Sequence, residues 1–158
     1  MDIGAMKRVV QQAIALVLGL ASIAIAGAPA VAADFRSVGI AVAVLYDGPS
    51  AKGKKLFLAP RGMPLEVVSA VSPWLKVRDL SGDVMWIAQA DVSNQRTVIA
   101  TGLATVRGAP QDTANALFQV ERGVTLELTD AAPAGGWVRV KHRDGAAGYI
   151  KSAELWGL

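Results

Sequence analysis

The feature that most constrains this chain is an internal repeat. Residues 43–68 align with residues 104–129 at an offset of 61, and after a slip of two residues the alignment resumes at an offset of 63. The slip falls where Pro and Gly mark a loop, at 69–73 and 129–136. The identical pairs are Ala43/Ala104, Pro49/Pro110, Leu56/Leu117, Phe57/Phe118, Arg61/Arg122, Gly62/Gly123, Leu65/Leu126, Glu66/Glu127, Trp74/Trp137, Val77/Val140, Gly82/Gly145, Ile87/Ile150 and Ala90/Ala153. The chain is therefore built from two copies of one structural unit.

The sequence of each copy predicts a series of short β-strands. In the first copy we expect strands at 38–46, 55–59, 65–69, 74–79 and 84–88, a long loop at 47–54 and a terminal turn at 89–92. In the second copy we expect strands at 100–107, 117–120, 125–128, 137–142 and 148–150, and a turn at 152–155. Residues 74–79 alternate apolar and polar, as in a half-buried strand, and Gly62 can supply the positive φ of a tight turn. Short strands between turns, with no helical periodicity, predict small barrels.

The N-terminus has the layout of a secretory signal peptide. Lys7 and Arg8 precede an uncharged apolar run at 13–26, and Ala30-Val31-Ala32 is a small-x-small cleavage site. The run of about 14 residues is shorter than the roughly 20 that span a bilayer. We expect residues 1–32 to be a cleavable signal peptide, so that the protein is periplasmic or secreted with no stable membrane insertion after cleavage. An uncleaved N-terminal anchor and a buried core helix are the alternatives, and Met6 is an alternative start.

The remaining chain divides into a module at 33–92, a linker at 93–98 and a second module at 99–158. Without residues 1–32, which carry Lys7, Arg8 and Asp2, 126 residues hold 14 Lys/Arg and 12 Asp/Glu, a net charge of +2. Nucleic-acid binding requires Lys and Arg clustered on one face, and we expect no nucleic acid as partner. The chain has no cysteine, which excludes disulfides and thiolate chemistry. Modules of about 60 residues are marginal alone, so we expect the two copies to pack against each other.

The motifs of both copies resemble those of bacterial SH3 domains. Leu45-Tyr46-Asp47 resembles the "ALYD" opening, and the segments at 60–67 and 122–127 resemble the hairpin that follows. The segments at 74–78 and 136–140 resemble the "GWxkV" strand, and Trp86-Ile87 and Gly148-Tyr149-Ile150 resemble the closing "G-[WY]-[VI]". The resemblance covers 37–92 and 99–155, and it departs from the family pattern at Val84-Met85 and at Arg107. It implies an all-β fold of two tandem small SH3-like β-barrels, and a module that binds or targets the cell envelope, often peptidoglycan or its peptides.

Alternation predicts an exposed aromatic face in each copy. If Leu75 and Val77 point into the core, Trp74 lies on the opposite side of its strand. The same argument places Trp137 outward in the second copy. The candidate ligand-binding residues are Tyr46, Trp74 and Trp86, the loop lysines Lys52, Lys54 and Lys55, and, in the second copy, Trp137 and Tyr149. Alternatively, the tryptophans cap the barrels or fill the interface between copies, and the lysines form a solvated loop.

The sequence contains no recognisable catalytic motif. His142 is the sole histidine, is expected to face solvent, and without cysteine cannot build a His/Cys zinc site. No serine lies in a nucleophile-elbow motif, and the repeated Glu66 and Glu127 suit an ion pair or a turn hydrogen bond. We therefore expect no enzyme activity, no metal and no cofactor. The sequence favours a cell-envelope binding module that recognises peptidoglycan or a wall-associated peptide through an aromatic groove. A periplasmic adaptor for extended or Pro-rich protein segments is the alternative, and a structural subunit without a ligand is a third.

Overall fold

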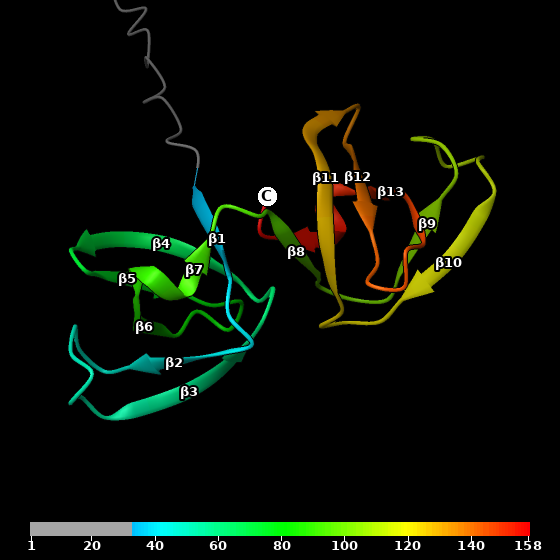
Figure 1. Cartoon of the computed structure of the whole chain (residues 1–158). Helices are drawn as coiled ribbons and strands as arrows, with labels where there is room; N and C mark the ends of the chain where they lie inside the picture. Colours follow the sequence, from blue (N-terminus) through cyan, green and yellow to red (C-terminus); the bar gives the residue numbers. More distant parts are fainter. Residues whose placement is uncertain (1–32) are drawn as a thin grey trace, which may run out of the picture. The chain divides into compact units, whose positions relative to one another are not determined.

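The computed structural model describes residues 33–158, and for residues 131–134 it describes the backbone only. The expected signal peptide lies outside the described residues. The predicted all-β fold is confirmed: each copy forms one seven-stranded antiparallel sheet (Figure 1). The helices among the described residues are three-residue 3-10 turns, η1 (Gln89–Asp91) and η2 (Ser152–Glu154), and no helix there is long and apolar enough to cross a membrane.

The first sheet curls around the core of copy one in the strand order β3-β2-β6-β5-β4-β1-β7. Its strands are β1 (Asp34–Val38), β2 (Val42–Tyr46), β3 (Lys55–Pro60), β4 (Pro64–Val71), β5 (Trp74–Arg78), β6 (Val84–Ala88) and β7 (Val92–Ser93). The turn between β3 and β4 contains Gly62 at φ +80°, the backbone conformation that the sequence predicts there.

The second sheet repeats this order as β10-β9-β13-β12-β11-β8-β14. Its strands are β8 (Thr97–Ala100), β9 (Ala104–Arg107), β10 (Ala116–Val120), β11 (Thr125–Ala134), β12 (Trp137–Lys141), β13 (Ala147–Lys151) and β14 (Leu155–Trp156). Gly123, the counterpart of Gly62, has φ +87°. The two copies therefore share their topology as well as their sequence pattern.

The centre of each sheet is filled by the same four positions of the repeat. These are Leu45/Val106, Leu65/Leu126, Val77/Val140 and Ile87/Ile150, and all eight side chains are at most 1% exposed. All but Leu65 lie between half-buried or exposed neighbours on their strands, as alternation requires. Leu65 follows the buried Pro64 at the start of β4. Burial of a side chain of this size contributes about 1.5–3 kcal/mol to folding, which makes these positions the core of each copy.

The prediction of one continuous first strand in each copy is wrong. The predicted range 38–46 contains the last residue of β1, a break at 39–41 and β2, and the range 100–107 contains the last residue of β8, a break at 101–103 and β9. Most of β1 and β8 lies before the predicted ranges. The chain bends between the two strands because they pair with different partners: β1 pairs with β4 and β7, whereas β2 pairs with β3 and β6.

The predicted loop at the alignment slip is also shorter than expected. β4 runs for 8 residues and β11 for 10, and each pairs with the strand that follows it. The two extra residues of copy two therefore lengthen a hairpin strand instead of a loop.

The two copies contact each other through β1 and β8. The hydroxyl of Thr97 donates to the carbonyl of Gly62 at 2.7 Å and lies 2.5 Å from the hydroxyl of Ser37. Ser37 and Thr97 are 2% and 6% exposed, so water does not replace this bond. Beside it the ring of Phe35 meets Trp156 edge to face, with 5.0 Å between centroids. The expected packing of one copy against the other is therefore present.

We predict that Thr97→Val destabilises the protein by about 1–3 kcal/mol, because it leaves the buried Ser37 hydroxyl and Gly62 carbonyl unpaired. Urea unfolding followed by circular dichroism measures the free energy of unfolding. The matched control is Thr101→Val, since the Thr101 hydroxyl also bonds a carbonyl, that of Glu154, but on the exposed surface. It is expected to change stability by less than about 0.5 kcal/mol. Equal losses in the two variants would contradict the prediction.

Candidate functional site

Three aromatic side chains of copy one form a continuous face on adjacent strands. Tyr46 ends β2 and is the cross-strand partner of Trp86 on β6. The Tyr46 ring meets that of Trp74, at the start of β5, edge to face, with centroids 5.6 Å apart at 87°. All three side chains are half-buried, so each keeps a portion of its ring exposed. The structure thus brings together the three aromatic residues that the sequence selects in copy one.

Lys76, which is not among the candidate residues predicted from the sequence, completes this face. Lys76 is the cross-strand partner of Trp86, and its ammonium lies 5.9 Å from the centroid of the Trp86 ring. A cation in this position is attracted by the ring quadrupole. Alternation places Lys76 on the same side of β5 as Trp74, and that signal was sufficient to find it. We call Tyr46, Trp74, Lys76 and Trp86 the aromatic face.

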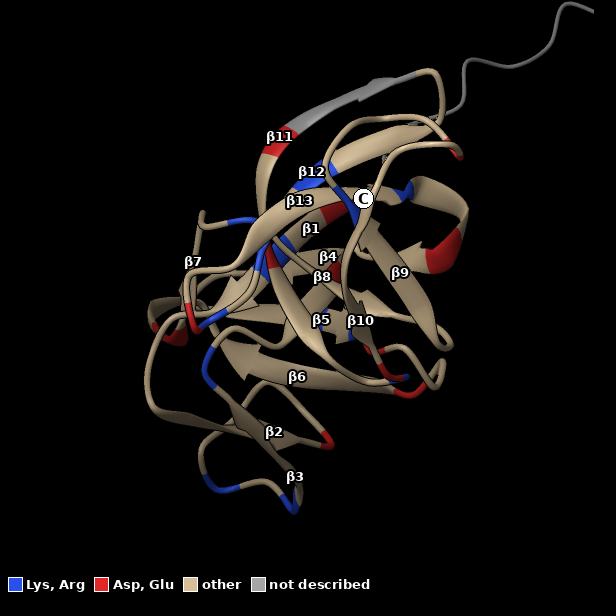
Figure 2. Ribbon diagram, turned by 90° about the vertical axis from the view of Figure 1, so that its right-hand side faces the viewer, with Lys and Arg blue, Asp and Glu red and all other residues tan. Residues whose placement is uncertain are grey.

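The three loop lysines lie at the end of the β2–β3 hairpin, where Figure 2 shows basic segments. Lys55 is the cross-strand partner of Tyr46 and so borders the aromatic face. Lys52 and Lys54 lie in the loop before β3, and all three are exposed. The carboxylate of Asp47 accepts the backbone N–H of Lys54 at 2.9 Å, which closes the loop. Among residues 33–158 none of these ammonium groups makes an ion pair, so their charge is available to a ligand.

The expected exposure of Trp137 in copy two is wrong. Trp137 is 7% exposed, whereas its counterpart Trp74 is half-buried. Its cross-strand partner is Lys151, whose ammonium lies 5.5 Å from the ring centroid and pairs with Asp112 at 2.6 Å. In copy one Ala88 occupies the position opposite Trp74. The long Lys151 side chain, held by Asp112, therefore covers the ring that a small alanine leaves open.

The second candidate residue of copy two, Tyr149, also has different surroundings from its counterpart in copy one, Trp86. Tyr149 is half-buried, and its cross-strand partner is Arg107, which replaces Tyr46. The Arg107 guanidinium donates to the carbonyl of Ala114 at 2.9 Å and so fixes the following loop. Copy two retains Trp137 and Tyr149 but not the ring contact that joins the aromatic face of copy one.

The charged groups near the core strands have structural partners. Glu66 accepts a hydrogen bond from Arg78 at 3.1 Å, the ion pair that its place on the strand suggests. His142 is half-buried, contrary to the expectation that it faces solvent, and pairs with Asp144 at 3.0 Å. The described residues contain no cluster of His, Cys, Asp or Glu suited to a metal ion.

We predict that the two equivalent tryptophans respond oppositely to a collisional quencher. Trp74→Phe removes an accessible fluorophore and is expected to lower the fraction of tryptophan emission quenched by acrylamide. Trp137→Phe removes a shielded one and is expected to raise that fraction, because Lys151 covers the ring. Each variant is the control for the other, since both keep an aromatic ring at the same place in the repeat. A similar change in both would contradict the difference in burial.

Known structures and families provide the remaining comparison. No curated protein matches the chain. Three similar solved structures are NlpC2 and NlpC1 from Trichomonas vaginalis and a NlpC/P60 family protein from Bacillus cereus ATCC 10987. They are 13%, 14% and 14% identical over 77%, 82% and 78% of this chain, each with a TM-score of 0.37. The chain covers 46%, 48% and 56% of them, or about half their length.

A family model described as bacterial SH3 domain matches twice in tandem, at residues 41–94 and 100–157. The two matches fall on the two sheets and together cover well over half of the sequence. The chain therefore belongs to the bacterial SH3 domain family, with two copies of the domain in tandem.

Proposed function

We propose that this protein is a non-catalytic cell-envelope binding protein that recognises peptidoglycan or a wall-associated peptide through the aromatic face of copy one. Bacterial SH3 domains are binding modules and are often associated with the cell wall. The observation that carries the proposal is the contact of Tyr46 with Trp74 beside Trp86, with all three rings partly exposed. Exposed aromatic rings held against one another in this way are typical of binding surfaces.

The chemistry of the aromatic face suits both the glycan and the peptide of a glycopeptide. Ring faces stack on the apolar faces of sugars, and aromatic grooves hold extended peptides. The rings come from three different strands of one sheet, so their spacing is fixed by the backbone pairing of β2, β5 and β6. A site held on strands requires little ordering when the ligand binds, which favours affinity.

The lysines give this face a preference for anions. Lys76 lies within the aromatic face, Lys55 borders it, and Lys52 and Lys54 are on the adjoining loop. Carboxylates of peptide stems or acidic envelope polymers would pair with these ammonium groups. Because Lys52, Lys54 and Lys55 are exposed and Lys76 is half-buried, salt screens this contribution, and binding should weaken as ionic strength rises.

The proposed location follows from the N-terminal pattern. A cleavable signal peptide at 1–32 would place the modules in the periplasm or outside the cell, where wall polymers are the abundant ligands. The alternative ligand, an extended or Pro-rich segment of an envelope protein, would use the same aromatic side chains, and the experiment below separates the two.

The proposal is tested by co-sedimentation of the purified protein with purified sacculi. We expect the protein to pellet with sacculi at low salt and less so at 0.5 M NaCl. Trp74→Ala is expected to weaken binding about 30-fold, the effect of losing an aromatic hot spot of about 2 kcal/mol. Lys76→Gln is expected to reduce binding less and to flatten the salt dependence.

Leu103→Ala is the control, because Leu103 is 68% exposed and lies outside the aromatic face. It removes a comparable exposed apolar side chain and should leave binding unchanged. Failure of the wild-type protein to pellet, or equal binding by Trp74→Ala with its circular dichroism intact, would refute recognition of peptidoglycan. Recovery of a single protein after cross-linking in cells, with no retention on sacculi, would favour the adaptor instead.

A further inference from the structure

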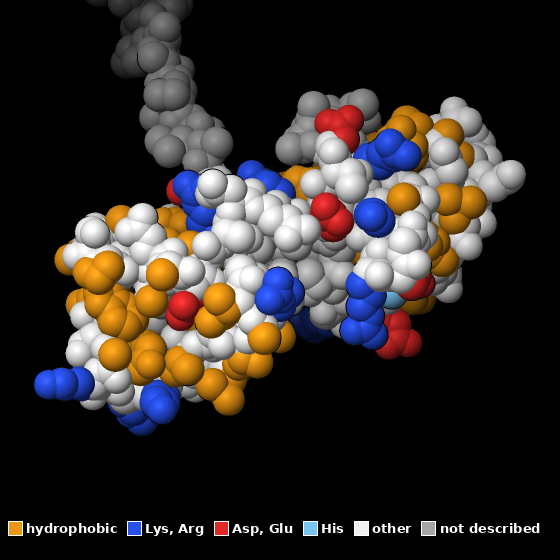
Figure 3. Space-filling view, in the orientation of Figure 1, with side chains coloured by type: hydrophobic (Ala, Val, Ile, Leu, Met, Phe, Trp, Pro, Cys, Tyr) orange, Lys and Arg blue, Asp and Glu red, His pale blue; other side chains and the backbone are white. Residues whose placement is uncertain are grey.

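The edge strand of copy one is apolar and exposed. β3 is the terminal strand of its sheet, so one of its sides has no strand from residues 33–158 beside it. Leu56, Phe57 and Leu58 follow one another on β3 and are 44%, 44% and 62% exposed. Figure 3 shows hydrophobic side chains gathered on copy one over the region of β2 and β3. A run of exposed apolar residues on a strand indicates an interaction surface.

The backbone of Leu58 faces the free side of β3. The N–H of Arg61 donates to the carbonyl of Ala41 at 3.0 Å, and residues of an antiparallel pair alternate between bonded and non-bonded positions. By this alternation Phe57 and Ala59 bond to β2, whereas the N–H and C=O of Leu58 point away from it. An extended peptide can add to a sheet edge through such backbone groups.

The side chains of this segment are apolar on both sides of the strand. Ala59 is fully buried, so Leu58 points outward and Phe57 lies on the inner side with Ala59. On the outer side Leu58 is the cross-strand partner of Val44, which is half-buried. The alternate side chains of an added strand therefore find apolar contacts on both sides.

Other features of β3 limit the open segment to a few residues. Leu56 is the extra residue of a β-bulge in the pairing with β2, as Leu117 is in copy two. At the other end Pro60 has no N–H, and its carbonyl already accepts the N–H of Met63 at 3.1 Å. Bulges, edge prolines and lysines such as Lys55 prevent long edge-to-edge pairing. The edge thus suits a short peptide, not a second sheet.

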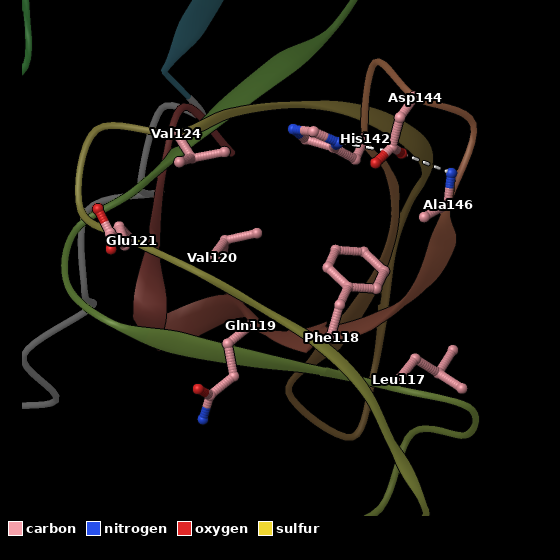
Figure 4. Close-up of a pocket in the computed structure, with 9 residues that line it drawn as sticks. All are labelled: Leu117, Phe118, Gln119, Val120, Glu121, Val124, His142, Asp144 and Ala146. Atoms are coloured by element: carbon pink, nitrogen blue, oxygen red, sulfur yellow. Dashed lines mark hydrogen bonds and ion pairs between the residues drawn. The ribbon is translucent and has the colours of Figure 1, made fainter.

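The corresponding edge of copy two is polar on its outer side. Gln119 of β10 stands where β3 has Leu58, and Glu121 stands where copy one has Pro60. Figure 4 shows Gln119 pointing away from the side to which Phe118 points. An added strand would lose its apolar contact on this side of copy two.

The inner side of the copy-two edge is covered by His142. Its ring centroid lies 6.4 Å from that of Phe118, which Figure 4 shows pointing toward it, and Phe118 is half-buried. Asp79 occupies this position of the repeat in copy one, and its carboxylate accepts two N–H groups of its own turn at 2.9 and 3.0 Å. Because that carboxylate is held at the turn, Phe57 stays exposed. The open edge is therefore a property of copy one alone.

Cations lie at both ends of the open segment. They are exposed, none makes an ion pair within residues 33–158, and they comprise Lys52, Lys54 and Lys55 before the segment and Arg61 after it. Lys55 is on the outer side, as the partner of Tyr46. Asp79 and Asp83 line a groove with Phe57 and so lie toward the inner side. Acidic side chains on the outer side of an added strand would pair with these cations.

The same charges oppose a second copy of the chain at this edge. Symmetric pairs of identical chains are related by a two-fold axis. Two antiparallel β3 strands would then place the lysine end of each beside Arg61 of the other, and like charges opposite one another destabilise a strand pair. Charge complementarity therefore favours an acidic peptide as the occupant.

From these observations we propose that the free edge of β3 binds a short extended segment of a partner protein as an added antiparallel strand. An aliphatic residue of the segment lies beside Leu58, and acidic residues flank it on the outer side. The two residues between them face inward beside Phe57 and Ala59. This site goes beyond the aromatic face and shares with it only the bordering Lys55.

The probe is the peptide acetyl-Glu-Val-Ile-Val-Glu-amide, titrated into the ¹⁵N-labelled protein and followed by amide chemical shifts. We expect shifts at β3 and none at β10, so copy two is the control within the same molecule. Acetyl-Lys-Val-Ile-Val-Lys-amide should bind at least about 10-fold more weakly, because like charge opposes binding. The acidic peptide with its Ile N-methylated should weaken as much, because the carbonyl of Leu58 then lacks a donor.

Leu58→Gln introduces the residue that copy two carries at this position, Gln119, and should weaken binding of the acidic peptide at least about 10-fold. Leu103→Gln is the matched control, since Leu103 is 68% exposed and lies in copy two. It should leave binding unchanged. Equal binding of either control peptide, or binding that survives Leu58→Gln, would overturn the proposal.

Three further outcomes would also overturn it. These are an absence of shifts at β3, shifts of equal size at β3 and β10, and shifts confined to Tyr46, Trp74 and Trp86. Spectra that change with protein concentration in the absence of peptide would indicate a second copy of the chain at the edge and would contradict the proposed occupant. Leu58→Gln should retain binding to sacculi, which tests only the aromatic face, so the two proposals fail separately.

Discussion

Apolar packing at four positions holds each copy together, and every other feature of the molecule depends on it. Leu45, Leu65, Val77 and Ile87, with their counterparts in copy two, are almost fully shielded from water. Because the chain has no cysteine, no disulfide supports these small sheets. Each core is marginal in size for a module of about 60 residues. The buried bond of Thr97 with Ser37 and Gly62 adds a contact between the modules, so neither core depends only on its own burial.

Once the core positions are fixed, the strands dictate which side chains face outward. Trp74, Lys76, Tyr46 and Trp86 become neighbours because β2, β5 and β6 are adjacent in the sheet. Copy two has the same backbone but a different surface, since Lys151 covers Trp137 and Arg107 replaces a tyrosine. The duplication thus preserves the scaffold and changes the aromatic site, while it keeps a leucine at the bulge that precedes Phe57 and Phe118.

The strand pattern, the glycine turns and the aromatic residues of copy one were predictable, because period-2 alternation and positive φ at Gly62 leave direct signals in sequence. The burial of Trp137 was not, since it depends on a lysine 14 positions away and on Asp112, which no local pattern connects. The bend between β1 and β2 was not predicted either: the apolar residues Val38, Ile40 and Val42 continue through it, and Gly39 was the local sign of the break. The bulges at Leu56 and Leu117 left no signal, because a bulge is visible only when two strands are paired.

The two extra residues of β11 matter for how a tandem protein folds. Neighbouring domains of similar sequence can exchange strands and become trapped in mixed structures. A hairpin that combined β4 with β12, or β11 with β5, would keep a second strand of the same length, since β5 and β12 each have 5 residues. The two copies differ instead in how the first strand pairs: the register of β11 with β12 shifts between Asp130 and Ala134, whereas β4 pairs with β5 without a shift from Ser69 to Val71. A hybrid hairpin would have to form this irregularity or lose it, so the divergence of the copies distinguishes each native hairpin from an exchanged one.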